Sequence, residues 1–556
     1  MSLFSYHQIR KCISFAVLLP LLYSSQIIAT NLSSLAKNDP YPIYKAVDPQ
    51  EFLNTWRALC LKGIPNEADE CCQDVSIAIS PFGQNACTGK NFCNQGVPLG
   101  DLNGRWSMVG LLMGPLPEGR TLPPTLLAAL QNLFPGVAEG TLTDPNIIDP
   151  NQTFGFFSVP LRYYKRGVRW DFALNLGYGF GFIFQGGLAD IVQKVEGFDN
   201  LTCLACPYPV NGTNCKNVLS APYTVDGQPA GTGPITKNGT AATQTAVNVA
   251  NTPTPPLPID CCNRICDSTI PCCGRFFTKN STTGAVSVID PLATEYPQYT
   301  TNNVQYFLMN QLRPIAKDIG LDICNFHKVS LEDLRFEIYW RDSHLVNKGR
   351  ATWAEFLFIP YVEFGGSIAV GAAEHSNYAF SLPFGNNGHH SIGATGGINL
   401  DFVDTVEIGA EVGITHFFAR DFCNLRIPNC MNGRQPANQC QLGIYPFSTE
   451  ARVQPGLNWQ FTAKLQCYHF IDRLSFFFQY VLVHHEHDHI CLRNPDPAFA
   501  PCVLEEMSNF TSQLGNFSLY YDISPRLNLG VLVQLPFQQQ NAYKSTTVMF
   551  SLWSTF

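Results

Sequence analysis

The sequence predicts an all-β fold, a transmembrane antiparallel β-barrel of about 14 to 16 strands with long cysteine-rich extracellular loops and a few short helices. Three observations predict it: polar and apolar residues alternate in many segments, short and long connections alternate along the chain, and an export signal comes first. Only 14% of the 556 residues are charged, whereas 45% are hydrophobic and 12% aromatic. That balance argues against disorder and against an ordinary soluble surface.

Residues 1–29 have the pattern of a secretory signal peptide. Arg10 and Lys11 precede an apolar run over 13–22, and small residues follow as far as Ala29. The run is about half as long as a spanning helix, which disfavours the alternative of an N-terminal membrane anchor. Residues 30–72 are then expected to be an N-terminal periplasmic segment with a short helix after Asp48, and residues 73–556 the barrel.

The strand pattern is clearest over residues 168–184. Even-numbered residues from Val168 to Phe184 are apolar and large, whereas the other face carries Arg169, Asp171 and several glycines. This is a period of two, which is typical of a strand with one greasy face. Thirteen candidate strands follow from such runs, at 73–82, 104–113, 153–164, 168–184, 334–341, 351–370, 393–402, 406–414, 457–467, 474–482, 517–523, 527–537 and 548–556. An even-numbered barrel would need one or three more.

The connections alternate in length from residue 104 onward. Short links are expected at 165–167, 403–404, 471–473 and 524–526, with a moderate one at 347–349. Long links are expected at 114–152, 186–330, 371–392, 419–456 and 484–513, and only the final link on that side, 538–541, is short. Outer-membrane barrels have tight periplasmic turns and long extracellular loops, so the long links are assigned to the outside of the cell. A further helix over 123–134 would either constrict the lumen or cover the rim. The Thr- and Pro-rich part of the 186–330 insertion, at about 200–300, would either bind a surface or act as a shielding loop.

The end of the sequence has the pattern of a barrel C-terminal signal. Counting back by twos from the final aromatic residue gives apolar positions broken only by Ser554. This pattern resembles the terminal recognition strand of bacterial outer-membrane barrels, and its residues are Val548, Phe550, Leu552 and Phe556.

The cysteines indicate an oxidising compartment. There are 21, and because Cys12 lies in the signal, 20 remain in the mature chain, an even number. Zinc is disfavoured because Cys203 and Cys206 have no second pair at finger spacing. The disulfide candidates, each bonded within the chain or to a neighbour, are Cys71, Cys72, Cys87, Cys93, Cys203, Cys206, Cys215, Cys261, Cys262, Cys266, Cys272, Cys273, Cys423, Cys430, Cys440, Cys491 and Cys502.

An export signal, an aromatic-ended barrel and some 20 loop cysteines together resemble the cysteine-rich outer-membrane porins of chlamydiae and their relatives, the major outer membrane protein type. The resemblance is one of organisation and transfers no individual residue. It implies a diffusion pore and a disulfide-linked envelope.

Other classes of function are disfavoured. With 35 basic against 43 acidic residues the net charge is −8, so a nucleic-acid partner is not expected. No spacing singles out a nucleophile with a histidine and an orienting group, so no enzyme activity and no cofactor are expected. A weak metal candidate is the histidine run His484, His485, His487 and His489, for which a polar strand end is the plainer interpretation.

The expected function is therefore that of a porin in the bacterial outer membrane, through which small hydrophilic solutes or ions diffuse passively. The alternative is a structural or adhesive protein that uses the barrel as an anchor. The expected partners are outer-membrane lipid, the solutes, and disulfide-linked neighbours or copies of the same chain. The expected pore-lining residues are Arg169, Asp171, Arg335, Glu337, Arg341, Glu407, Glu411 and Lys464.

Overall fold

The computed structural model describes residues 36–46, 75–92, 94–103, 106–107, 118–121, 156–200, 224–225, 228–229, 277–279, 286–288, 312–346, 356–402, 405–428, 445, 447–524 and 526–556. The signal peptide at 1–29 and the helices expected after Asp48 and over 123–134 lie outside these residues, as does most of the 200–300 segment. No helix in the described part of the chain is long and apolar enough to cross a membrane.

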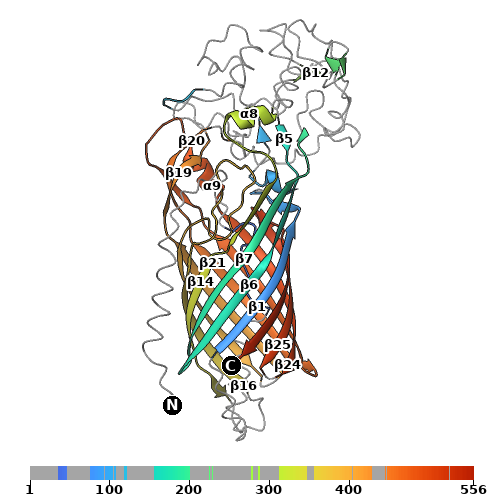
Figure 1. Ribbon diagram of the computed structural model, residues 1–556, viewed down its shortest axis with the longest axis vertical. Coiled ribbons are helices and arrows are strands. Elements are labelled where there is room, and N and C mark those ends of the chain that lie inside the picture. The colour runs from blue at the N-terminus through green and yellow to red at the C-terminus, as the bar shows by residue number, and fades with distance from the viewer. Residues whose placement is uncertain are drawn as a thin grey trace.

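A closed antiparallel ring of 12 strands forms the body of the molecule (Figure 1). The ring closes because β6 pairs with both β1 and β7. In ring order the strands are β1 (Val75–Ala86), β6 (Leu161–Gly177), β7 (Phe180–Val195), β14 (Leu334–Arg341), β16 (Phe356–Ile368), β17 (Ser391–Asp401), β18 (Val406–Phe417), β21 (Asn458–Ile471), β22 (Leu474–His485), β24 (Phe510–Ser524), β25 (Leu527–Gln540) and β27 (Thr546–Thr555). Two short strands, β13 (Phe326–Leu331) and β15 (His344–Val346), pair with β7 and β16 beyond the ends of β14.

The ring has fewer strands than the 14 to 16 expected from the sequence. The candidate at 104–113 does not join it: β4 (Trp106–Ser107) pairs instead with β5 (Phe156–Ser158) in a small separate sheet. Ten of the other candidates each overlap one ring strand, whereas the candidates at 153–164 and 168–184 together cover β6 and the start of β7. The ring therefore has an even number of strands.

The alternation over residues 168–184 belongs to two strands rather than to one. A two-residue turn at Tyr178 and Gly179, with φ of 55° and 83°, separates β6 from β7. A β-bulge between Asn175 and Gly177 shifts the register by one residue, so even-numbered residues stay on the outer face across the turn. The short link expected at 165–167 was wrong for the same reason, because those residues lie inside β6.

The two faces of the barrel wall have opposite chemistry. In β18, Glu407 and Glu411 on the inner face are buried, whereas Ile408 and Val412 on the outer face are 49% and 60% exposed. Apolar outer faces recur along the ring strands, as Ile77, Phe336 and Phe550 illustrate. A closed ring with an apolar outer belt and a polar interior is the arrangement of bacterial outer-membrane barrels. The chain is therefore a membrane-spanning barrel of this class, with lipid against its outer face.

The two rims differ as the alternating connections predict. Short turns join β6 to β7, β17 to β18, β21 to β22 and β24 to β25, at the rim where Phe556 pairs with Val75 (Figure 1). Long connections leave the opposite rim, which by the outer-membrane rule is the extracellular one. Parts of these connections fold at that rim, namely β2 (Thr88–Lys90), β3 (Gly96–Pro98), η2 (Leu99–Asp101), β8 (Asp199–Asn200), α8 (Leu312–Asp318) and β26 (Ala542–Tyr543). Two isolated hairpins are β9 (Thr224–Val225) with β10 (Gln228–Pro229) and β11 (Phe277–Lys279) with β12 (Val286–Val288).

A small folded unit, here named the extracellular cap, is built from two of the long connections. It comprises β19 (Arg420–Arg426), β20 (Ser448–Gln454), β23 (His489–Leu492) and α9 (Pro501–Glu506) (Figure 1). Its core is apolar and includes Phe422, Leu425 and Ile490. The cap therefore has the ordinary construction of a water-soluble domain.

Candidate functional site

The barrel lumen concentrates the polar chemistry of the molecule. The eight residues expected to line it all lie at inward-facing positions of the ring strands. Six are buried, namely Arg169, Asp171, Arg341, Glu407, Glu411 and Lys464. Arg335 and Glu337 line an internal cavity. Whether these side chains contact a passing solute stays a prediction.

Residues 36–46 lie inside the barrel, where they contact strands on several sides of the ring. Asp39 pairs with β6, the Tyr41 carbonyl accepts a hydrogen bond from Gln534 of β25 at 3.1 Å, and the Ala46 amide donates to Ser551 of β27 at 2.8 Å. We name residues 36–46 the lumen segment. The expectation that all of 30–72 lies in the periplasm does not hold for these residues. The sequence pattern could not predict this position, because it depends on contacts with residues far away in the sequence.

The local sequence suits an extended course through a narrow lumen. Pro40 and Pro42 have fixed φ angles and favour extended conformations in the residues that precede them. Prolines also carry no backbone N–H group, so the segment has fewer donors to satisfy away from water.

A buried ion network fastens the lumen segment to the wall. The Asp39 carboxylate accepts hydrogen bonds from Lys165 Nζ at 2.9 Å and from Arg169 Nη2 at 2.7 Å. Glu332 lies between β13 and β14 and binds the same two cations, with its Oε1 2.6 Å from Lys165 Nζ and 2.8 Å from Arg169 Nη2. All four side chains are at most 7% exposed. Two cations and two carboxylates therefore compensate one another, as buried charges require.

Three members of this network were not among the expected lining residues. Lys165 was assigned to a turn and Asp39 to the periplasm, and Glu332 follows a strand that the sequence did not reveal. Arg169 was the member that the alternating pattern could identify. Its guanidinium also donates to the Ile43 carbonyl at 2.6 Å.

A second polar cluster connects three strands of the wall without the lumen segment. Lys464 Nζ lies 2.8 Å from Glu411 Oε2, and the Tyr361 hydroxyl donates to the same oxygen at 2.6 Å. Nearby, the Tyr468 hydroxyl donates to Glu407 at 2.6 Å. Two expected lining carboxylates and the expected lysine thus have partners within the wall.

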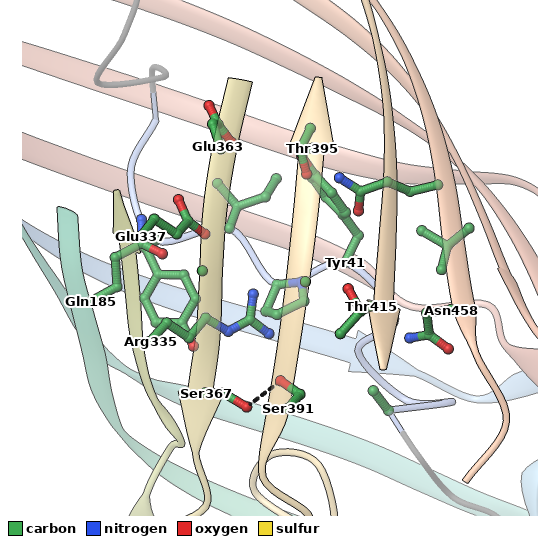
Figure 2. A pocket seen from close by; sticks show the side chains of 18 of the residues that line it. Tyr41, Gln185, Arg335, Glu337, Glu363, Ser367, Ser391, Thr395, Thr415 and Asn458 are labelled. Carbon is green, nitrogen blue, oxygen red and sulfur yellow. Dashed lines mark hydrogen bonds between the residues drawn. The ribbon is translucent and has the colours of Figure 1, made fainter. Parts of the chain in front are cut away.

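A cavity of about 270 Å³ remains between the lumen segment and the wall. Figure 2 shows Arg335 pointing into it, with Glu337 and Glu363 on the same side and Thr415 and Asn458 across from them. Ser367 and Ser391 form a 2.7 Å hydrogen bond at one edge. The lining therefore offers charged, amide and hydroxyl groups in a space that can hold several waters or one small solute.

The connection over 369–390 is bonded to residues of the barrel wall beside β14 and β16. Asp333, at the start of β14, accepts hydrogen bonds from the amides of Gly371 and Asn386 at 3.0 and 2.6 Å. The Asn386 side chain then donates to Ser367 of β16 at 2.8 Å. These bonds hold the connection against the inner wall.

Arg426 ties the cap to this connection and to α8. Its guanidinium donates to the carbonyls of Tyr445 at 3.0 Å, Ile319 at 2.5 Å and Ser376 at 3.4 Å. Burial lowers the pKa of Arg426 to about 10, which leaves it charged at neutral pH. One cation therefore satisfies carbonyls from three separate segments.

The histidine run does not converge on one point. His485 is buried and bonded to Asn458 and Asp488, at 2.5 and 2.8 Å. His484 bonds Thr511, whereas His487 donates to the Glu505 carbonyl. Within the described ranges, no group of three or more histidine, cysteine, aspartate or glutamate side chains is arranged to hold a metal ion.

Four of the disulfide candidates lie in the described part of the chain, and each is a free thiol: Cys87, Cys423, Cys491 and Cys502. The other thirteen candidates lie outside the described residues. Disulfide cross-linking therefore stays a prediction.

Comparison with known proteins finds no matching family model and no matching curated protein. Solved structures similar to the chain include an outer membrane channel from Pseudomonas putida F1, with 6% identity, a TM-score of 0.36, and coverage of 87% of this chain and 96% of that one. The translocator domain of the autotransporter NalP from Neisseria meningitidis has 7% identity and a TM-score of 0.27, with coverage of 92% and 99%. A FadL homologue from Pseudomonas aeruginosa has 8% identity and a TM-score of 0.27, with coverage of 96% and 99%.

These likenesses concern the barrel fold alone, and membership of the chlamydial porin family gains no support from them. The outer-membrane assignment rests on the chain's own closed ring, apolar outer belt and unequal rims. By its architecture the chain is an outer-membrane β-barrel with an internal segment bound in its lumen.

Proposed function

We propose that the protein is a channel for passive diffusion of small hydrophilic solutes, and that the lumen segment, residues 36–46, restricts the passage. The solutes cross down their gradients, and the inward-facing charges screen them by size and sign. The wider proposal includes loops that form disulfides with one another or with neighbouring envelope proteins.

The observation that carries the proposal is the polar cavity between the lumen segment and the wall. A barrel used only as an anchor has no need of an interior that water can enter. Here polar groups face a space of about 270 Å³, and hydrogen bonds and ion pairs help to hold the segment beside it. Such contacts can be exchanged for water when the segment moves, because each separated ion regains hydration.

The deciding experiment is single-channel conductance in planar bilayers, with the full chain and a variant that lacks residues 36–46. The full chain should give small steps, and the deletion should give several-fold larger ohmic steps because the cavity then joins the rest of the lumen. Asp421→Asn is a matched control, since Asp421 pairs with Arg493 on the outside of the cap. It should leave the conductance unchanged.

Two outcomes would contradict the proposal. If both proteins fold as barrels and neither conducts, the anchor alternative, a structural or adhesive protein, is favoured. If both conduct equally, the lumen segment does not restrict the passage.

A further inference from the structure

The extracellular cap places a thiol, an imidazole and a carboxylate in series. Cys491 Sγ lies 3.3 Å from His489 Nε2, and His489 Nδ1 lies 3.0 Å from Glu505 Oε1. The first two residues are two positions apart on β23, so they project from the same face of that strand. Glu505 comes from α9, which packs against β23.

The hydrogen bonds of this series set the position of Glu505 and the tautomer of His489. The Ile490 amide donates to Glu505 Oε1 at 2.6 Å, which holds the carboxylate in place. A carboxylate accepts hydrogen bonds, so the proton of a neutral His489 sits on Nδ1 and Nε2 is left as an acceptor. That acceptor faces the Cys491 thiol. A nucleophile, a base and a group that orients the base are thereby aligned.

The neighbouring thiol on the same sheet provides an internal comparison. Cys423 of β19 is a free, exposed thiol, as Cys491 is. Among the hydrogen bonds of the described residues, the Cys491 contact is the one that joins a thiol to an imidazole. Cys502 of α9 differs again, because burial and the nearby acidic residues Glu506 and Glu505 raise its pKa.

We propose that Cys491 is an imidazole-assisted nucleophile that exchanges with disulfides of molecules outside the cell. This proposal is independent of passage through the lumen. His489 Nε2 accepts the thiol proton while Cys491 Sγ attacks one sulfur of the external disulfide. A new Sγ–S bond forms, the original S–S bond breaks, and the departing thiolate takes the proton back from Nε2. One external disulfide is reduced to a thiol, Cys491 is oxidised to a mixed disulfide, and no other reactant is required.

The position of the set suits an external partner. His489 is 71% exposed, and Cys491 is exposed beside it on the cap. An exposed thiol beside a base is the setting in which cysteines react, whereas buried thiols are inert. The reaction is stoichiometric, so it does not by itself make the protein an enzyme.

The test is a rate measurement at each cysteine of the full, membrane-inserted chain. The protein is treated at pH 7 with glutathione disulfide or with the neutral probe iodoacetamide, and peptide mass spectrometry follows each thiol separately. Cys491 should react at least about tenfold faster than Cys423, since general-base assistance is typically worth a hundredfold or more in a preorganised site. His489→Gln should bring the Cys491 rate down to that of Cys423, and Glu505→Gln should lower it in part.

His484→Gln is the matched control, because the His484 ring bonds the Thr511 hydroxyl and not a thiol or Glu505. It should leave the Cys491 rate unchanged. Unchanged hydrogen exchange of the cap amides shows that the cap of each variant is folded. Equal rates at Cys491 and Cys423 in the wild-type chain, or an unchanged Cys491 rate in folded His489→Gln, would overturn the proposal. If iodoacetamide alkylates Cys491 quickly but glutathione disulfide forms no mixed disulfide with it, the Cys491 thiol is activated. That result would overturn disulfide exchange as its reaction.

Discussion

The barrel wall and the extracellular cap bury opposite kinds of side chain. In the barrel wall, Arg169 and Glu411 are buried whereas Val412 is 60% exposed; in the cap, Phe422 and Leu425 are buried whereas Asp421 and Arg493 face outward. The same chain therefore follows opposite burial rules a short distance apart. The difference shows that the surrounding solvent decides which side chains are buried. Lipid surrounds the barrel, and water surrounds the cap.

The largest expected effect comes from the barrel interior. Arg169→Met would leave the carboxylates of Asp39 and Glu332 with one cation between them, in a site from which water is largely excluded. Removing one partner of a buried ion pair typically costs about 3–5 kcal/mol. Urea unfolding of the vesicle-inserted protein measures the change. Lys464→Met should cost less, because Glu411 keeps the Tyr361 hydroxyl as a donor. Equal losses of unfolding free energy in Arg169→Met and Lys464→Met would mean that the lumen segment adds no stability to the ion network of Asp39, Lys165, Arg169 and Glu332.

The outer wall provides the next effect. Val412→Arg would place a cation against lipid near the middle of β18, with an expected cost of about 2–4 kcal/mol in the free energy of unfolding. Thr415→Arg is the matched change on the inner face of the same strand, where Thr415 lines the polar cavity. Unfolding in vesicles should show a smaller loss for Thr415→Arg. A larger loss there would contradict the assignment of the two faces.

Acidification should weaken the region between the barrel and the cap. His389 is buried, and its Nδ1–H donates to the Phe418 carbonyl at 2.9 Å. Burial lowers the pKa of His389 to about 4, against an ordinary value near 6.5. The unfolded segment therefore binds the proton more readily, so stability is full above pH 6.5 and is lost as the pH falls toward 4.

The shift in the pKa of His389 corresponds to a loss of about 3 kcal/mol in the free energy of unfolding when the residue is fully protonated. Hydrogen exchange of the cap amides at pH 7.0, 5.5 and 4.5 should show faster opening as the pH falls. Asp488, Arg420 and His390 also act on His389, so Asp488→Asn is measured in parallel. His389→Gln should flatten the profile, and an unchanged profile in that variant would assign the acid sensitivity to other groups.

The smallest effect is expected at the cap surface. Asp421 and Arg493 form an ion pair with side chains 56% and 45% exposed. Such pairs contribute about 0–1 kcal/mol because water and salt screen them. Asp421→Asn should therefore change the unfolding free energy of the cap little, in contrast with Arg169→Met. A loss comparable to that of Arg169→Met would remove the distinction between the two regions.

Much of the barrel could be predicted from local pattern. The alternation of Glu407, Ile408, Glu411 and Val412 gave the correct faces because each strand residue has only two sides. The short links at 471–473 and 524–526 were also predicted, because turn residues interrupt the alternation there. The turn at Tyr178 was not, since the bulge beside it preserves the alternation across the hairpin.

The sequence by itself determined the barrel class, the polarity of its two faces and the unequal rims, because these depend on residues close in the chain. The tertiary structure alone decided the ring of 12 strands, the lumen segment and the cap. Lys165 meets Asp39 and Glu332 across long stretches of chain, and His489 meets Glu505 only when α9 packs on β23. The alternation of residues within a strand cannot predict such contacts, because they form only when segments far apart in the sequence fold against one another.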